Sequence, residues 1–304
     1  MPSKTDFNVS PYYDDFSQAK NFHRVMYRPG FAVQARELTT QQSILQNQIE
    51  KFGDHMFKNG SMVIPGGISF NFAHRVVKLT SFTGTLTNFK DTTVTGGTSG
   101  VKAVVKSVAA TDGTDPDSLF LIYKDSGSDN EKGAFDVGET ITSDASTGET
   151  AVVSESSFGS ICYINAGVFY VNGFFVESEQ QELILDKYNT APSYRIGFTI
   201  TESFITSTDD SSLLDNAQGS SNENATGAHR LKITLTLAKL ALDSTADSSF
   251  VELSRVINGD LVKKVSHSDY NIIEDELARR TFDESGDYTI QNFDLDVREN
   301  LIAG

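Results

Sequence analysis

The strongest constraint on the fold is a helical repeat near the N-terminus, the only long one in the first two-thirds of the chain. Its residues are spaced alternately by four and three positions: Leu38, Gln42, Leu45, Ile49, Phe52 and Met56. We call these six residues the seam, because this spacing places them in one row along an α-helix and is typical of coiled coils. Gln42 is the one polar member, where an apolar residue is expected.

Local signals indicate where this helix begins and ends. Pro29-Gly30 marks a turn before it. Thr39, followed three residues later by Gln42, has the spacing of a capping box, in which a hydroxyl and an amide satisfy backbone donors of the first turn. Lys58-Asn59-Gly60 supplies a cation for the last turn and a glycine that can adopt a left-handed conformation. The sequence therefore predicts a helix that starts at Thr39 and closes at Gly60.

The seam has two interpretations. In the first, the helix packs the seam on β-structure of its own chain. In the second, identical helices from several copies associate through it. The seam is shorter than three heptads and contains Gln42, so the pattern alone does not decide between them.

Most of the remaining chain alternates apolar and polar residues with the period of β-strands, as in residues 68–72. In residues 168–176, Asn172-Gly173 separates two apolar runs. This pair specifies a two-residue hairpin, because both central positions need a positive φ. A shorter helical pattern follows near residues 269–283, where Asp269 is a candidate N-cap.

The middle of the chain contains an internal repeat. Ser-Gly-Val-Lys-Ala-Val-Val at residues 99–105 returns as Thr-Gly-Glu-Thr-Ala-Val-Val at residues 147–153. Each copy has a hydroxyl residue and a glycine that favour a turn, followed by a short β-strand. Between residues 107 and 158 acidic residues far outnumber the two lysines, Lys124 and Lys132.

These patterns predict a mainly β fold with an extended N-terminal arm, one long α-helix, two β-sandwich or barrel-like domains and a short second helix. The predicted division has an arm and attachment or oligomerisation helix in residues 1–60, a main β-domain in residues 61–80 and 158–304, and an inserted acidic β-domain in residues 81–157.

Several blocks of the sequence resemble a known family: residues 12–16 (Tyr-Tyr-Asp-Asp-Phe), 20–25, 28–30, 33–38 (Val-Gln-Ala-Arg-Glu-Leu), 46–55, 185–189, 192–195, 228–233 and 277–288. The family has no known biochemical role and occurs in virion structural proteins of large tailed bacteriophages, notably contractile-tailed phages of cyanobacteria. The resemblance covers most of the chain and is weaker near residues 80–157. It implies a place in a tail or baseplate rather than a reaction. In that family the end of the present sequence resembles the end of an attachment region, so we expect the native protein to continue.

The resemblance also implies partners. Similar tail-fibre proteins commonly associate in threes, which predicts a homotrimer that contacts other baseplate or tail subunits. The expected interface combines the seam with aromatic residues of the arm: Tyr12, Tyr13, Phe16 and Phe22. The polar, glycine-rich segment 206–227 is also expected to contact a partner, because long loops are uncommon unless functional.

Composition argues against several classes of protein function. The chain has 41 acidic and 25 basic residues, a net charge of −16, which argues against binding nucleic acid. No segment has the length and hydrophobicity of a membrane span or a signal peptide, so we expect synthesis in the host cytoplasm and a place in the virion. Cys162, the single cysteine, lies in an apolar run and is expected to be buried filler.

No pattern indicates catalysis. The histidines are scattered without metal-ligand spacing, and no nucleophile elbow or phosphate-binding glycine loop occurs. The clustered acids lack the spacing of a calcium loop and favour a solvated surface. We therefore expect no catalytic activity, no cofactor and no metal.

The sequence favours a structural protein of a phage tail, at the baseplate or a fibre junction, which anchors through its N-terminal region and supports distal domains. The alternative is a receptor-binding module for a host-surface glycan, with Tyr163, Phe169, Tyr170 and residues 216–224 as candidate contacts. A depolymerase on the same β-scaffold is the third hypothesis.

Overall fold

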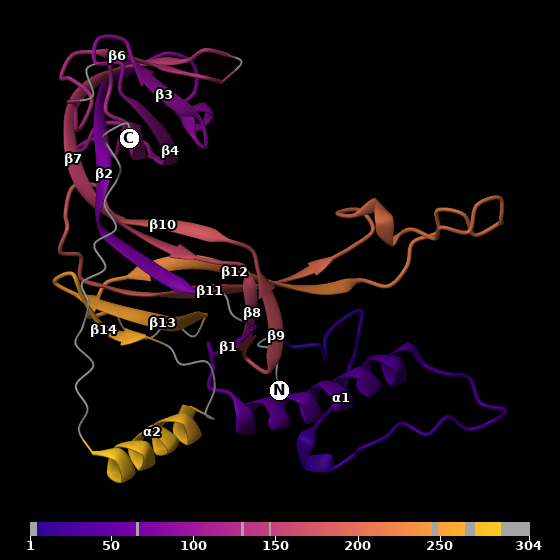
Figure 1. Cartoon of the computed structure of the whole chain (residues 1–304). Helices are drawn as coiled ribbons and strands as arrows, with labels where there is room; N and C mark the ends of the chain where they lie inside the picture. The colour runs from indigo at the N-terminus through magenta and orange to yellow at the C-terminus, as the bar shows by residue number, and fades with distance from the viewer. Residues whose placement is uncertain are drawn as a thin grey trace.

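The computed structural model describes residues 5–64, 67–128, 131–145, 147–244, 249–264 and 271–286. It confirms the predicted fold class: a mainly β chain with one long helix, α1 (Ala35–Met56), and a short helix near the C-terminus, α2 (Asn271–Ser285) (Figure 1). Asp269, the candidate cap of the second helix, lies outside the described residues. No helix among the described residues is long and apolar enough to cross a membrane.

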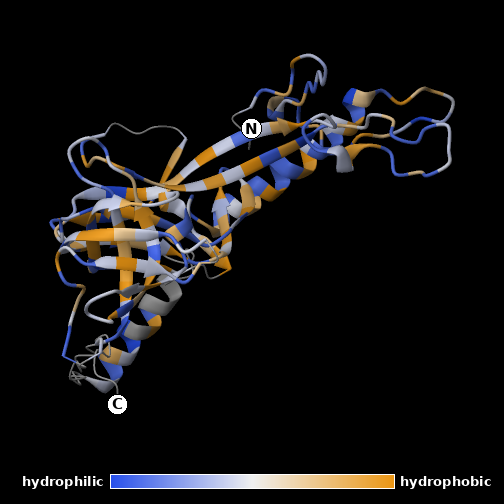
Figure 2. Cartoon of the chain, turned by 90° about the horizontal axis from the view of Figure 1, so that it is seen from above, coloured by the Kyte–Doolittle hydropathy of each residue, from blue (hydrophilic) through white to orange (hydrophobic). Residues whose placement is uncertain are grey.

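The strands of the described residues form three antiparallel sheets and are rich in hydrophobic residues (Figure 2). The first sheet has the order β1 (Met62–Ile64), β8 (Gly167–Val171) and β9 (Phe174–Ser178). The second has the order β10 (Gln181–Asp186), β7 (Thr150–Ile164), β2 (Ile68–Phe82), β5 (Ser118–Asp125), β4 (Lys102–Ala109), β3 (Thr93–Gly96) and β6 (Thr140–Ser143). The third has the order β12 (Arg230–Leu240), β11 (Tyr194–Ile205), β13 (Phe250–Ile257) and β14 (Asp260–Lys264). Short 3-10 helices are η1 (Gln18–Lys20), η2 (Leu86–Phe89) and η3 (Ser211–Leu213).

Part of the second sheet closes into a barrel, because β6 pairs with β7 as well as with β3. Closure leaves these strands without an exposed edge, which protects them from pairing with other chains. Alternating residues of the strands point inward and, together with Phe89 of η2, form a buried core that includes Val77, Val105, Leu121 and Val153. The long strands β2 and β7 leave the barrel and continue into the rest of the molecule (Figure 1).

The internal repeat occupies equivalent places in this barrel. In the first copy, Val94 of β3 pairs with Ala103 of β4. In the second copy, Ile141 of β6 pairs with Ala151 of β7. Each copy is therefore the second strand of a hairpin with matching register. The predicted limits of an inserted domain, near residues 80 and 158, fall within β2 and β7, so the division into separate domains stays a prediction.

The repeated glycines give a test of this equivalence. Gly100 and Gly148 have φ values of 69° and 60°, a conformation that costs other residues about 1–2 kcal/mol. Around Gly148 the space for a Cβ is open, whereas at Gly100 it would lie 2.3 Å from Ser128 Oγ. We expect Gly148→Ala to lower the free energy of unfolding by about 1 kcal/mol, and Gly100→Ala to lower it further. Urea denaturation checks this order, with Gly148→Asn as the control that tolerates the conformation. Equal losses at both glycines would contradict the prediction.

A second core lies between the first and third sheets, the start of β2, the end of β7 and strand β10. Phe169 of β8 meets Phe198 of β11 edge to face, with ring centroids 4.8 Å apart. Around this pair the core buries Ile164, Leu237 and Val256. The arrangement is sandwich-like: side chains from facing sheets interdigitate in one apolar layer.

The predicted hairpin at residues 168–176 is confirmed. Val171 pairs with Phe174 across the turn, and Asn172 and Gly173 have φ values of 48° and 85°. Phe169 and Tyr170 on β8 point to opposite faces of the strand, as expected from its pleat. Phe169 enters the core described above, whereas Tyr170 faces α1. Both faces of β8 are therefore covered.

The structure corrects both ends of α1. The helix begins at Ala35, four residues before the predicted cap Thr39. Its capping box consists of Gln34 and Glu37: Glu37 Oε2 accepts the backbone N–H of Gln34 at 2.9 Å, and the Gln34 side chain accepts the N–H of Glu37. The prediction failed because serine and threonine are the usual caps, and glutamine at that position carries a weak signal.

Thr39 lies inside the first turns of the helix, and its hydroxyl donates to the backbone oxygen of Arg36 at 2.9 Å. The predicted closing signal at Gly60 is also displaced, because the helix ends at Met56 and Phe57 is its C-cap. Gly60 does adopt a left-handed conformation, with φ of 92°, but in the turn that leads to β1.

Candidate interaction surface

Helix α1 is fixed to the β8–β9 hairpin through one face. Gly53 is buried against Tyr170, so close that a Cβ on Gly53 would lie 2.4 Å from Tyr170 Cε2. The Tyr170 hydroxyl donates to Asp54 Oδ1 at 2.6 Å and contacts the backbone oxygen of Glu50 at 3.0 Å. Burial, and then the Asp54 carboxylate, raise the pKa of Tyr170 well above its usual value. Gln46 Nε2 adds a hydrogen bond of 2.8 Å to the turn residue Gly173.

The N-terminal arm contacts the same side of the helix. Asp14 is buried, and its carboxylate accepts hydrogen bonds from the hydroxyls of Thr40, at 2.9 Å, and Ser43. Ile44 and Asn47 complete the buried face of the helix. Because contacts with the hairpin and with the arm both fall on this side, the helix has a defined rotation about its axis.

That rotation leaves the seam in solvent. The exposed fractions of Leu38, Leu45, Ile49 and Phe52 are 52, 57, 44 and 63%. Gln42 is also exposed, and Met56 is half-buried. The structure therefore contradicts the interpretation in which the seam packs on β-structure of its own chain. Gly53 explains the difference: the close approach of Tyr170 requires the face that carries this glycine, not the face that carries the seam.

The aromatic residues of the arm divide into two groups. Tyr12 and Phe16 are half-buried, whereas Tyr13 and Phe22 are exposed. The ring of Tyr12 stacks on Phe204 of β11 at 5.1 Å, and its hydroxyl lies 2.7 Å from Nδ1 of His229. We call residues 5–16 the inner arm, because they reach the β-structure, and residues 17–33 the outer arm, which contacts α1; the Tyr27 hydroxyl donates to Gln41 Oε1 at 2.9 Å.

A cavity of about 250 Å³ lies between the inner arm, α1, the β8–β9 hairpin and the outer ends of β11 and β12. Aromatic side chains supply most of its apolar lining: Phe7, Tyr12, Phe16, Phe174 and Phe204. Polar residues also line it, from the inner arm, α1 and the start of β12: Asp14, Thr39, Gln42, Ser43, Gln46, His229 and Arg230. None of the wall residues from β9 and β11 had been singled out from the sequence, because the strand pattern gives no sign of which elements meet there.

Segment 206–227, which joins β11 to β12, projects from the same end of the molecule as the outer arm (Figure 1). It contains the short helix η3 and a single bridge between Leu214 and Thr226. Asp209 and Asp210 accept hydrogen bonds from backbone N–H groups of Thr206 and Ser212. The pKa of Asp209 is lowered first by the Thr206 backbone bond, and the pKa of Asp210 first by a hydrogen bond from the Ser212 side chain.

Two of the aromatic residues considered for glycan binding are not available. Phe169 and Tyr170 are fully buried, one in the core and one under α1. Tyr163 is half-buried and packs edge to face with His74. A sugar platform must present its ring to solvent, so the structure contradicts glycan contacts at Phe169 and Tyr170.

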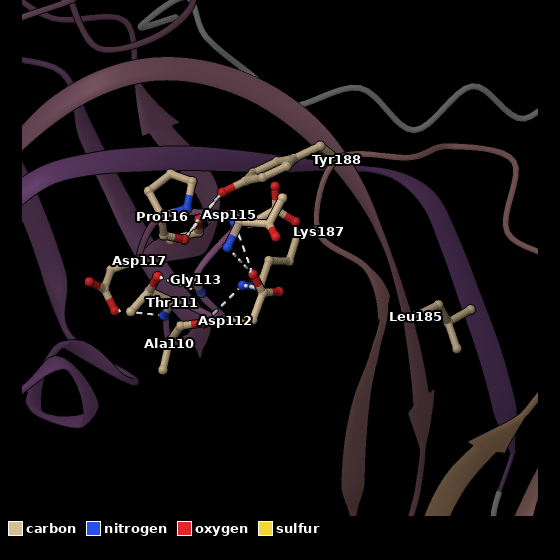
Figure 3. A network of polar contacts seen from close by, with 12 residues as sticks. Ala110, Thr111, Asp112, Gly113, Asp115, Pro116, Asp117, Leu185, Lys187 and Tyr188 are labelled. Atoms are coloured by element: carbon tan, nitrogen blue, oxygen red, sulfur yellow. Dashed lines mark hydrogen bonds and ion pairs between the residues drawn. The ribbon is translucent and has the colours of Figure 1, made fainter.

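Acidic residues in the turn between β4 and β5 of the barrel form hydrogen bonds within that turn (Figure 3). Asp112 Oδ1 accepts the backbone N–H groups of Thr114 and Asp115, and Oδ2 lies 3.1 Å from Lys187 Nζ. The hydrogen bond from the Asp115 backbone is the first cause that lowers the pKa of Asp112, to about 2. No group of three potential metal ligands occurs in the described part of the chain. Cys162 is fully buried, as expected, and burial raises its pKa to about 12.

Comparison with known proteins gives one family. No match was found among curated proteins or among solved structures. A family model described as a domain of unknown function, DUF4815, matches residues 10–142 and 127–303, which together include the arm, α1, the barrel and the sandwich. The chain belongs to this family.

Proposed function

We propose that this chain is a structural, non-enzymatic component of a bacteriophage tail. In this proposal the arm and α1 anchor the chain at the baseplate or a fibre junction, and the β-structure supports more distal parts. The sequence resemblance to virion proteins motivates the location. Association of three copies through the seam would form the anchor.

The observation that carries the proposal is the exposed seam on a helix whose opposite face is already docked. Four large apolar side chains in one row are a contiguous patch of the kind that marks a protein interface. A solvent-facing helix of an isolated chain would carry polar residues in that row. Gln42 lies within the patch, where a polar residue can fix the register and number of associating helices.

Self-association is tested with charges in the seam. We expect Leu45→Glu combined with Ile49→Glu to convert the oligomer into monomers, because neither glutamate can be solvated between packed helices. Sedimentation equilibrium measures the mass. Gln48→Glu is the matched control: Gln48 is exposed on the same helix but outside the seam, so this variant should associate as the parent does. A parent chain that stays monomeric at high concentration, or an oligomer unaffected by both seam charges, would contradict the proposal.

The location is tested separately on virions of the phage that encodes the chain. A gold-labelled antibody against the purified protein should mark the tail end of the particle in electron micrographs. Label on the head, or none on intact and disrupted particles, would remove the tail assignment while leaving the result on self-association unchanged.

A further inference from the structure

The outer arm differs from the rest of the chain in charge and exposure. Residues 17–33 contain Lys20, Arg24 and Arg28 and no acidic residue, in a chain of net charge −16. The segment also exposes large apolar side chains; the most exposed are Phe22, Met26 and Phe31, with exposed fractions of 64, 84 and 64%. A cationic segment with this much exposed apolar surface is suited to an acidic partner surface that offers an apolar pocket.

The chain itself has such a surface at the same end of the molecule. Segment 206–227 contains four acidic residues, Asp209, Asp210, Asp215 and Glu223, and no lysine or arginine. Each carboxylate accepts a backbone N–H within the segment, which holds its charge in place. The outer ends of β11 and β12, from which the segment projects, form one wall of the aromatic cavity.

The size of the cavity limits what it can hold. At about 250 Å³ it is smaller than the sites that enclose drug-sized ligands. Its aromatic walls suit one apolar side chain, the kind of anchor that supplies most of the energy of many protein interfaces. The outer arm presents several such side chains, which is why we assign the cavity to a protein anchor.

We propose that the outer arm of one copy of this chain lies along segment 206–227 of a second copy and inserts an apolar side chain into its aromatic cavity. The inference rests on the proposed function, because it describes a second contact within the same assembly. Gln42 belongs both to the seam and to the edge of the cavity, so the two contacts are continuous. The outer arm and the cavity are different surfaces, so the contact is head-to-tail and closes into a ring under rotational symmetry.

A photo-cross-link at the most exposed arm residue tests the contact. With benzoylphenylalanine in place of Met26, irradiation of the full chain should give covalent dimers, and mass spectrometry should locate the bond in residues 204–231. A mixture of isotopically heavy and light chains separates bonds between copies from bonds within one. The control places the same group at Val262, an exposed residue of β14, where no dimer is expected. Bonds within a single copy, or bonds between copies at any other segment, would overturn the proposal.

Charge variants test the electrostatic part. Arg24→Gln with Arg28→Gln removes arm charges, and Asp209→Asn with Asp215→Asn removes segment charges while keeping an acceptor oxygen for each turn. At low salt each pair should weaken association about tenfold, and combining the pairs should cost much less than one hundredfold, since they remove the same contact. The seam variants distinguish association through the seam from the contact of the outer arm with segment 206–227. If seam charges dissociate the oligomer but both charge pairs leave its affinity unchanged, the arm contact is wrong and seam association stands.

Discussion

Replacing Gly53 with alanine should destabilise the natural chain by about 1–3 kcal/mol, yet stabilise a chain that already carries Tyr170→Ala. In the natural chain a Cβ at this position meets the ring of Tyr170, which is buried and held by Asp54 and by the Glu50 backbone oxygen. The ring has no free space to retreat into, so the helix must move away from the hairpin.

The effect of Gly53→Ala on the free energy of unfolding should change sign once the Tyr170 ring is removed. Tyr170→Ala alone should cost about 3–5 kcal/mol, as for other large buried aromatic residues. In that background alanine at position 53 meets no ring, and it gains about 1 kcal/mol over glycine from helix propensity. Urea denaturation of the four chains measures the coupling. Additive effects of the two substitutions would show that this contact does not fix the rotation of α1, and the exposure of the seam would then lack its physical cause.

This contact also shows what the sequence could and could not predict. The spacing of the seam predicted a helix, and the helix exists. The face on which the helix docks depends on Gly53 and Tyr170, residues 117 positions apart, and no local pattern pairs them. Sequence periodicity therefore located the apolar row but could not decide whether this row faced its own chain.

The β-structure divides in the same way. Asn172-Gly173 predicted a hairpin because the turn requires two left-handed residues, and the structure has both. The repeat predicted two similar turn–strand units, but the barrel closes through the pairing of β6 with β3, which joins residues 140–143 to residues 93–96, and no local pattern pairs them. No local pattern could have predicted the cavity, since its walls come from the inner arm, α1, β9, β11 and β12.

Acid should weaken the fold through His74, which lies on β2 where the barrel joins the sandwich. The imidazole is buried and stacks on Phe120. Its Nδ1 faces the side-chain nitrogen of Asn71 at 3.1 Å, and this nitrogen can only donate, so Nδ1 accepts and the ring proton is on Nε2. Nε2 has no hydrogen-bond partner among the described residues. Burial lowers the pKa of His74 from 6.5 to about 4.

The direction of the change in stability with pH follows from proton binding to His74. The unfolded chain takes up a proton at His74 below pH 6.5, whereas the folded chain resists it until about pH 4. The stability contributed by the neutral ring is therefore complete above pH 6.5 and is lost as the pH falls towards 4, by about 3 kcal/mol in all. We expect the free energy of unfolding, measured in urea at pH 7.5 and 4.5, to fall by most of that amount, and His74→Phe to remove this part of the fall.

Glu252 also titrates with a lowered pKa, but in a pH range below that of His74. Burial alone would raise the pKa of Glu252, but hydrogen bonds from Arg255, Arg195 and Lys263 lower it to about 2. Its contribution is present above pH 4.5 and is lost only as the pH falls from there towards 2. Between pH 7.5 and 4.5 the natural chain and His74→Phe should therefore differ through the imidazole alone. Parallel stability profiles for the two chains across this range would show that His74 is not held neutral by burial.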